Sequence, residues 1–112
     1  MGLDFYEAQS LNEIHANDEM VELSEELQEY LYKRREIVNF DIECIYGIDP
    51  YGETEIEIEQ VKNIIIACEK LADGEYLLDY DDMEGGKESL NELKNLCKSA
   101  IENNKRVCAI GD

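Results

Sequence analysis

The sequence DPYGETEIEI, residues 49–58, decides the fold, because it joins a tight turn to a strand pattern. Asp at the first, Pro at the second and Gly at the fourth position are typical of a type I turn. From Glu53 to Ile58, glutamate alternates with Thr or Ile, the period of two of a strand with one buried face. Phe40–Ile48, before the turn, alternates in the same way. We therefore expect a hairpin of two antiparallel strands.

Three amphipathic helices are expected around this hairpin. Glu59–Leu71 has the clearest pattern, with apolar residues every three or four positions and Gly74 as a C-terminal stop. A helix before the hairpin begins at Ser24, a good N-cap followed by two glutamates that favour the positive end of the helix dipole, and its apolar stripe starts at Leu23. A third apolar stripe predicts a helix from about Lys87 to Asn103.

The two ends of the chain are each expected to add a short strand. These strands are Leu3–Ala8 and Arg106–Ile110, whereas Gln9–Glu19 is polar and expected to be irregular. Residues 75–86, rich in acid and glycine, are expected to form a loop. The sequence thus predicts a single globular α+β domain over 1–112, with a small antiparallel sheet packed with about three helices and with 1–22 partly irregular.

The balance of charge excludes several classes of partner. The chain has 112 residues, 28 of them acidic and 10 basic, which gives a formal net charge of -18 at pH 7. A phosphate backbone or an anionic lipid surface requires a cationic protein surface, so neither nucleic acid nor a membrane is expected as partner. Hydrophobic residues make up 44% of the chain, too many for a disordered acidic tail.

The cysteines and the N-terminus indicate a cytoplasmic protein without metal or cofactor. Cys44, Cys68, Cys97 and Cys108 are widely spaced, without the paired spacing of a zinc site. No basic segment followed by an apolar one opens the chain, so no secretory signal is visible. We therefore expect four reduced thiols rather than two disulfides.

No catalytic motif is recognised, and the protein is not expected to be an enzyme. His15 is the only histidine and falls in the segment expected to be irregular, which makes it a poor candidate for a catalytic base. Gly85-Gly86-Lys87 lacks the remainder of a phosphate-binding loop.

The acidic residues are concentrated in the first 80 positions, which contain 21 acidic and 5 basic side chains. The sharpest candidate for binding a cationic partner is the row Glu53, Glu55 and Glu57, with carboxylates about 7 Å apart on one strand face. The same row is equally well explained as the solvated outer face of an edge strand. A second candidate is the set Asp79, Asp81, Asp82 and Glu84, which lacks the glycine and glutamate positions of a calcium loop.

Tyrosines are the expected anchors of a protein interface, because their rings bury area while the hydroxyl stays hydrated. Of the seven tyrosines, Tyr51 and Tyr80 are the candidates that we place beside the acidic residues. Tyr30 and Tyr46 are expected to pack inside the domain instead. The turn residues Asp49, Pro50 and Gly52 are expected to maintain the fold rather than to bind a partner.

Three features of the sequence are Ile48-Asp49-Pro50-Tyr51-Gly52-Glu53-Thr54, the helix that follows it, and the terminal Ile110-Gly111-Asp112. In these features the chain resembles small bacterial immunity proteins of contact-dependent inhibition and other polymorphic toxin systems. The resemblance extends from about Val38 to Asp112, and that group more often has Asp at the position of Glu53. It implies a cytosolic inhibitor that binds one copy of the toxic domain of its cognate toxin, often a nuclease. Because a nuclease site that holds polyphosphate is basic, an acidic inhibitor fits it.

The leading interpretation is therefore an immunity protein that occludes the active site of a cognate basic toxin domain, with 1:1 stoichiometry. A nucleic-acid mimic that inhibits a defence nuclease would have the same electrostatics. A small acidic subunit of a larger assembly and a small enzyme or cation-binding protein are also compatible with the sequence. These three hypotheses differ in what they predict: several unrelated DNA-binding partners, an exposed apolar patch, or a converging catalytic or cation site.

Overall fold

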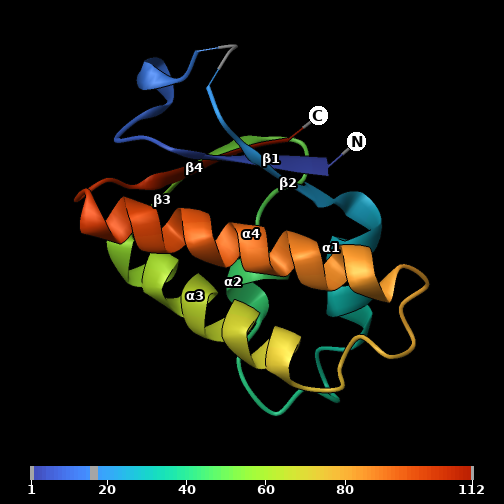
Figure 1. The fold of residues 1–112 in the computed structure, drawn as a ribbon. Helices are drawn as coiled ribbons and strands as arrows, with labels where there is room; N and C mark the ends of the chain where they lie inside the picture. Colours follow the sequence, from blue (N-terminus) through green and yellow to red (C-terminus); the bar gives the residue numbers. More distant parts are fainter. Residues whose placement is uncertain (1, 16–17, 112) are drawn as a thin grey trace.

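A four-stranded antiparallel sheet and four α-helices form the fold in a computed structural model, which describes residues 2–15 and 18–111. The strands are β1 (Gly2–Glu7), β2 (Val21–Ser24), β3 (Glu53–Ile56) and β4 (Val107–Gly111), in the order β2-β1-β4-β3. The helices α1 (Glu25–Lys33), α2 (Glu43–Tyr46), α3 (Ile58–Asp73) and α4 (Met83–Glu102) lie on one side of the sheet (Figure 1). The predicted α+β class is confirmed.

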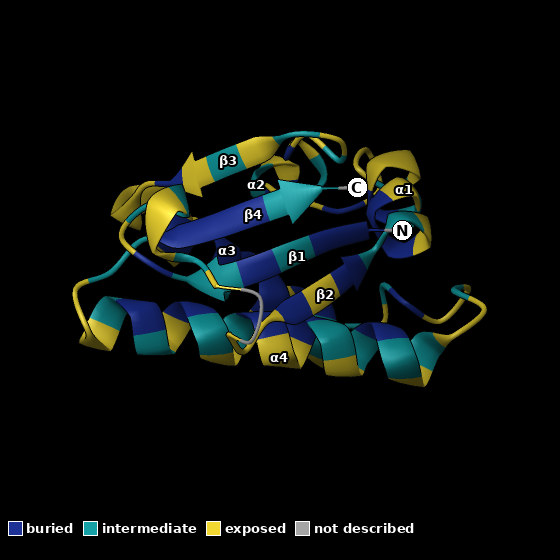
Figure 2. Ribbon diagram, turned by 90° about the horizontal axis from the view of Figure 1, so that it is seen from above, coloured by how far each residue is buried: buried dark blue, intermediate teal, exposed yellow. Residues whose placement is uncertain are grey.

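The core lies between the sheet and the helices. On the inner face of the sheet, alternate residues of the two central strands, among them Leu3, Phe5 and Ala109, are fully buried. They contact the apolar stripes of α3 and α4, which lie side by side and include Ile64, Leu90 and Leu93. Viewed from above the sheet, β1 and β4 are mostly buried whereas the edge strand β3 is largely exposed (Figure 2). No helix in the described part of the chain is long and apolar enough to span a bilayer.

The predicted strand Phe40–Ile48 is wrong, because this segment contains the short helix α2. Burial follows a spacing of three, at Ile42, Ile45 and Ile48, rather than the alternation read from the sequence. The side chain of Gln28, itself buried on α1, donates hydrogen bonds to the carbonyls of Ile45 at 3.3 Å and of Ile48 at 2.9 Å. A residue distant in sequence therefore satisfies the carbonyls that a neighbouring strand would have bonded.

The expected hairpin is consequently wrong as well. β3 pairs with β4 from the other end of the chain, with Thr54 opposite Ala109, and it ends at Ile56 rather than at Ile58. The turn itself forms as predicted: the amide of Gly52 donates to the carbonyl of Asp49 at 3.5 Å, and the amide of Tyr51 donates to the Asp49 side chain at 2.9 Å.

The turn lies directly against the C-terminal strand. The amide of Gly111 donates to the carbonyl of Gly52 at 2.8 Å, and a Cβ atom at Gly111 would lie 2.1 Å from the carbonyl oxygen of Pro50. Only glycine allows this approach of two backbones. The turn at 49–52 and the C-terminal strand thus meet in one structural contact, although Asp112 lies outside the described residues.

Two further element boundaries differ from the sequence prediction. Strand β2 was missed, because Leu23 was assigned to the helix stripe; Ser24 ends β2 and then caps α1 by accepting from the amide of Leu27 at 3.1 Å. Helix α4 begins at Met83 rather than at Lys87. Gly86 on this helix packs against the ring of Tyr80, where a Cβ atom would be only 3.1 Å from the ring.

Candidate functional site

The row of three glutamates does not form on one strand face. Glu53 and Glu55 project from the outer face of β3, whereas Glu57 is the N-cap residue of α3. Arg106 lies between two of them, with its guanidinium 3.9 Å from the Glu55 carboxylate and 3.3 Å from that of Glu57. Glu55 also accepts a hydrogen bond from the amide of Leu11 at 3.0 Å. Only Glu53 of this row lacks a described partner, which favours a structural role for Glu55 and Glu57.

The acids of residues 79–84 are likewise partly engaged in the fold. Asp79 pairs with Arg34 at 3.0 Å, and Asp82 caps α4 by accepting from the amide of Gly85 at 3.1 Å. Asp81 and Glu84 are exposed. Across the described residues, no group of three or more acid, histidine or cysteine side chains is arranged to hold a metal ion.

The two candidate tyrosines have different environments. Tyr51 is 67% exposed beside the turn, and its hydroxyl donates to the Glu25 carboxylate at 3.1 Å. This bond raises the pKa of Tyr51, because it stabilises the protonated phenol next to a carboxylate. Tyr80 is half-buried, with its ring 5.0 Å from that of Tyr30. Tyr51 is therefore the more accessible of the two.

The structure contains an acidic cleft of about 680 Å³ that the sequence did not predict. It lies beside the C-terminal half of β1, between the segment that precedes β2 and the C-terminal half of α4. β2 begins at Val21, opposite Phe5, so Tyr6 and Glu7 pair with β4 on one side and with no described strand on the other. The cleft occupies the position that a longer β2 would have filled.

Carboxylates dominate the charged groups of the acidic cleft. Its charged and titratable side chains, apart from the phenol of Tyr6, are Glu7, Glu13, Asp18, Glu19, Glu92, His15 and Lys105. Within the described residues none of the five carboxylates forms an ion pair, and those that have partners accept only from neutral groups. Glu13 accepts from the amide of Gln9, Asp18 from the amide of His15, and Glu7 from the side chain of Asn103, at 2.8–3.0 Å.

Apolar side chains form part of the wall of the acidic cleft. They include Met20, Val21 and Leu96, together with the ring of Tyr6, whose hydroxyl lies 3.6 Å from the sulfur of Met20. Burial, together with the negative charges of Asp4 and Asp18, raises the pKa of Tyr6. The phenol therefore stays protonated, and the cleft offers apolar contact area beside its carboxylates.

The acidic cleft shows no hydrogen-bonded catalytic arrangement. Ser99 and His15 both line it, but no hydrogen bond links the His15 ring to Ser99 or to a carboxylate within the described residues. The Ser99 hydroxyl accepts from the side chain of Asn103 at 3.4 Å instead. The arrangement can attract and hold a cation, whereas a polarised nucleophile is not assembled here.

The signal for the acidic cleft was present in the sequence but weak. Positions 1–32 contain nine acidic residues and neither Lys nor Arg. Most of the carboxylates in the cleft come from this segment, and Glu92 is added by α4. Only the packing of α4 beside β2 shows that these residues enclose one space.

Comparisons of the chain with family models, with curated proteins and with solved structures found no match.

Proposed function

We propose that this protein binds and neutralises a strongly cationic protein, in the manner of an immunity protein that blocks a basic nuclease-type toxin domain. One observation carries the proposal: five carboxylates line a single cleft, and none of them has an ion-pair partner among the described residues. Like charges held together without counterions destabilise the fold by mutual repulsion. A cationic partner would remove that repulsion on binding.

The charge distribution also supports fast association. A surface of one sign steers an oppositely charged partner and raises its association rate, an effect that salt weakens because the screening length is only about 8 Å at physiological ionic strength. The apolar wall of the acidic cleft would then supply contact area once the partner has docked. In this proposal the protein acts by occlusion, with 1:1 stoichiometry and without chemistry of its own.

The proposed place of action is the cytoplasm, where the toxin domain would meet its inhibitor. All four cysteines have free thiols, and Cys68, Cys97 and Cys108 are buried. Burial raises the pKa of the Cys108 thiol to about 11, so this group stays protonated at neutral pH and is a poor nucleophile. Free, unreactive thiols are consistent with a reducing compartment.

In the test, the immobilised protein captures its binding partner at low salt from a lysate of the source cells. The bound partner is eluted at high salt and identified by its mass. The purified partner is then titrated with the protein by calorimetry. We expect a 1:1 complex with a lysine- and arginine-rich domain, whose activity is lost on binding. A partner without excess basic residues would contradict the proposal, and binding to several unrelated DNA-binding proteins would favour the nucleic-acid mimic instead.

A further inference from the structure

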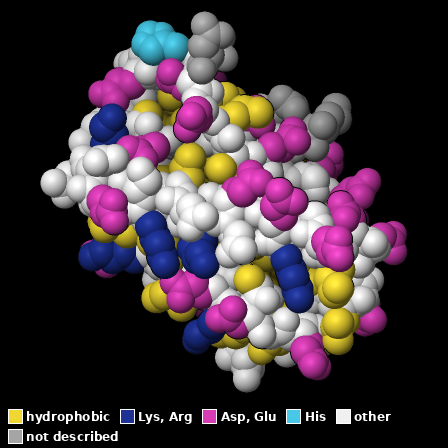
Figure 3. All heavy atoms as spheres, viewed as in Figure 1, with side chains coloured by type: hydrophobic (Ala, Val, Ile, Leu, Met, Phe, Trp, Pro, Cys, Tyr) yellow, Lys and Arg dark blue, Asp and Glu magenta, His cyan; other side chains and the backbone are white. Residues whose placement is uncertain are grey.

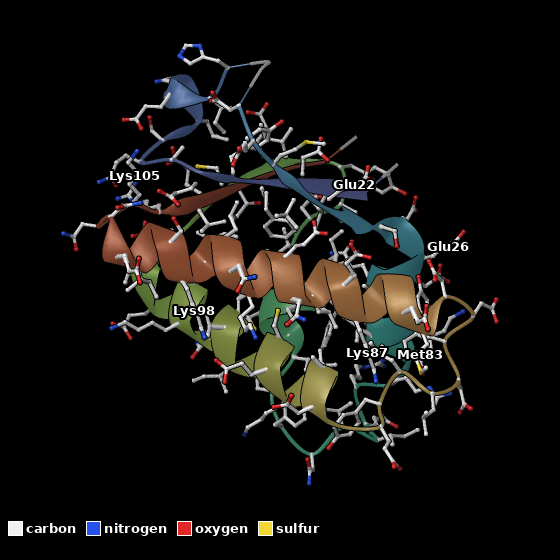
Figure 4. All side chains as sticks on the ribbon, in the orientation of Figure 1. Glu22, Glu26, Met83, Lys87, Lys98 and Lys105 are labelled. Atoms are coloured by element: carbon white, nitrogen blue, oxygen red, sulfur yellow. The ribbon has the colours of Figure 1, made fainter. Side chains whose placement is uncertain are left out.

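A second, smaller hollow of about 230 Å³ lies at a different place on the molecule. It is formed by α1, the end of α2 and the turn that precedes β3, and its lining residues are Glu25, Gln28, Glu29, Tyr32, Tyr46 and Pro50. We call it the tyrosine hollow. Glu26, next to Glu25 on α1, and Lys105, in the acidic cleft, mark opposite ends of the molecule (Figure 4). The two hollows are therefore separate sites.

The walls of the tyrosine hollow are aromatic rings and carboxylates. Tyr32 and Tyr46 meet edge to face, with ring centroids 5.4 Å apart and an angle of 75° between their planes. Tyr32 nevertheless remains 48% exposed. Glu25 projects beside them, and the hydroxyl of Tyr51 donates to it at 3.1 Å. Aromatic faces with adjacent carboxylates are the groups that recognise a guanidinium ion, through cation–π contact and charged hydrogen bonds.

The tyrosine hollow is held in a fixed shape. Gln28 at its wall is buried and engaged with three backbone carbonyls of residues 45–48. The turn that contributes Pro50 is bound to the C-terminal strand through Gly111. A preformed hollow loses little conformational entropy on binding, which is a property of interface hot spots.

The molecule already uses the same contact internally. The guanidinium carbon of Arg35 lies 3.9 Å from the ring centroid of Tyr32, and that of Arg34 lies 5.1 Å from the ring centroid of Tyr30. Arg35 covers one face of the Tyr32 ring but does not line the tyrosine hollow, so an arginine bound in the hollow would contact the rest of that ring and Tyr46. One of them, Glu29, pairs with Lys33 at 3.2 Å, but both side chains are more than half exposed and such a pair exchanges readily.

We propose that the tyrosine hollow is the anchor point for a single arginine side chain of the cationic protein partner. This inference rests on the proposed function and adds to it a second contact, at a hollow that shares no lining residue with the acidic cleft. Arginine fits better than lysine, because its planar guanidinium can pack against the rings of Tyr32 and Tyr46 while donating to Glu25 or Glu29.

The experiment uses hexaarginine and hexalysine peptides as probes, titrated into the isotope-labelled protein at about 0.15 M salt and followed by amide NMR shifts. We expect hexaarginine to shift amides of residues 25–32 and 46–51, and to bind there at least about threefold more tightly than hexalysine. Tyr32→Ala should weaken this site about threefold or more. Ile37→Ala, which removes another exposed side chain outside the hollow, should leave it unchanged.

Four other results of the peptide titration would overturn the inference, and they differ in what they imply for the proposed function. Shifts confined to the acidic cleft would remove the arginine anchor and leave the proposed function standing. Equal binding of hexalysine, or an unchanged affinity in Tyr32→Ala, would reject the arginine assignment. Absence of binding by either peptide at both hollows would contradict the inference and the proposed function together.

Discussion

The surface over α3 and α4 and the acidic cleft beside β1 are both rich in acid, but they differ in what the acids contact. On the helical surface, Glu59 lies 3.8 Å from Lys62 and Glu69 lies 3.5 Å from Lys98, and side chains of both signs are present on the face that Figure 3 shows. In the cleft the carboxylates have no such partners among the described residues. Exposed pairs contribute little to stability, but each of them offsets a negative charge locally. The comparison shows that the acids paired with lysine on the helices are segregated from the acids of the cleft, which have no such pairs.

The largest effect is expected for partner association. The double variant Glu19→Lys/Glu92→Lys reverses two cleft carboxylates, and we expect it to slow association with the captured partner by about 10- to 100-fold at low salt, because steering depends on the local field. Glu59→Lys/Glu69→Lys makes the same change in net charge on the helical surface and should slow association less than about threefold. Stopped-flow mixing measures both rates, and equal slowing would show that only net charge matters.

The next effect concerns stability and compares a buried glutamine of the helical layer with an exposed one near the cleft. Gln28→Leu removes the donor to the carbonyls of Ile45 and Ile48, and should lower the free energy of unfolding by about 1–2 kcal/mol. Gln9→Leu removes an exposed bond to the carbonyl of Asn104 and should change it by less than about 0.5 kcal/mol. Urea unfolding measures both values. Similar losses in the two variants would refute the role given to Gln28.

A smaller effect tests the repulsion in the acidic cleft without any partner. Glu19→Gln/Glu92→Gln should raise the free energy of unfolding by about 0.5 kcal/mol at low salt, since neighbouring like charges are unfavourable by about that amount. Glu59→Gln/Glu69→Gln removes attractive pairs and should lower it slightly or leave it unchanged. Both differences should shrink in high salt. A stabilisation of equal size in both variants would contradict the segregation of charge.

The smallest effect is expected at the edge strand. Arg106→Gln breaks exposed contacts with Glu55 and Glu57, and should lower the free energy of unfolding by less than about 0.5 kcal/mol. The same change frees two carboxylates and should leave association with the partner unchanged or slightly faster. Slower association would show that Arg106 itself contacts the partner.

Local signals in the sequence predicted the elements that depend on neighbouring residues. The helical period of α3, the Ser24 cap of α1 and the turn at 49–52 were all found, because each depends on side chains within a few positions. The pairing of β3 was not found, because its partner β4 lies at the other end of the chain. The alternation at 40–48 predicts a strand in place of α2, because the burial of Ile42, Ile45 and Ile48 and the bonds from Gln28 depend on contacts with other helices.

The sequence predicts an acidic surface for a cationic partner, but it does not predict the acidic cleft. Acid excess pointed to a cationic partner, and the row beginning at Glu53 had the cleanest pattern. That pattern instead marked an edge strand whose charges are partly paired by Arg106. The acidic cleft depends on where β2 stops and on how α4 passes beside it, and neither is encoded by a local motif.

The central claim is that the partner docks on the acidic cleft, and hydrogen–deuterium exchange of the complex tests it most directly. The account predicts that the captured partner slows amide exchange in peptides covering residues 6–8, 18–21 and 92–99, while peptides of α3 exchange at the same rate as in the free protein. Protection confined to α3, with the peptides of the cleft unchanged, would contradict it.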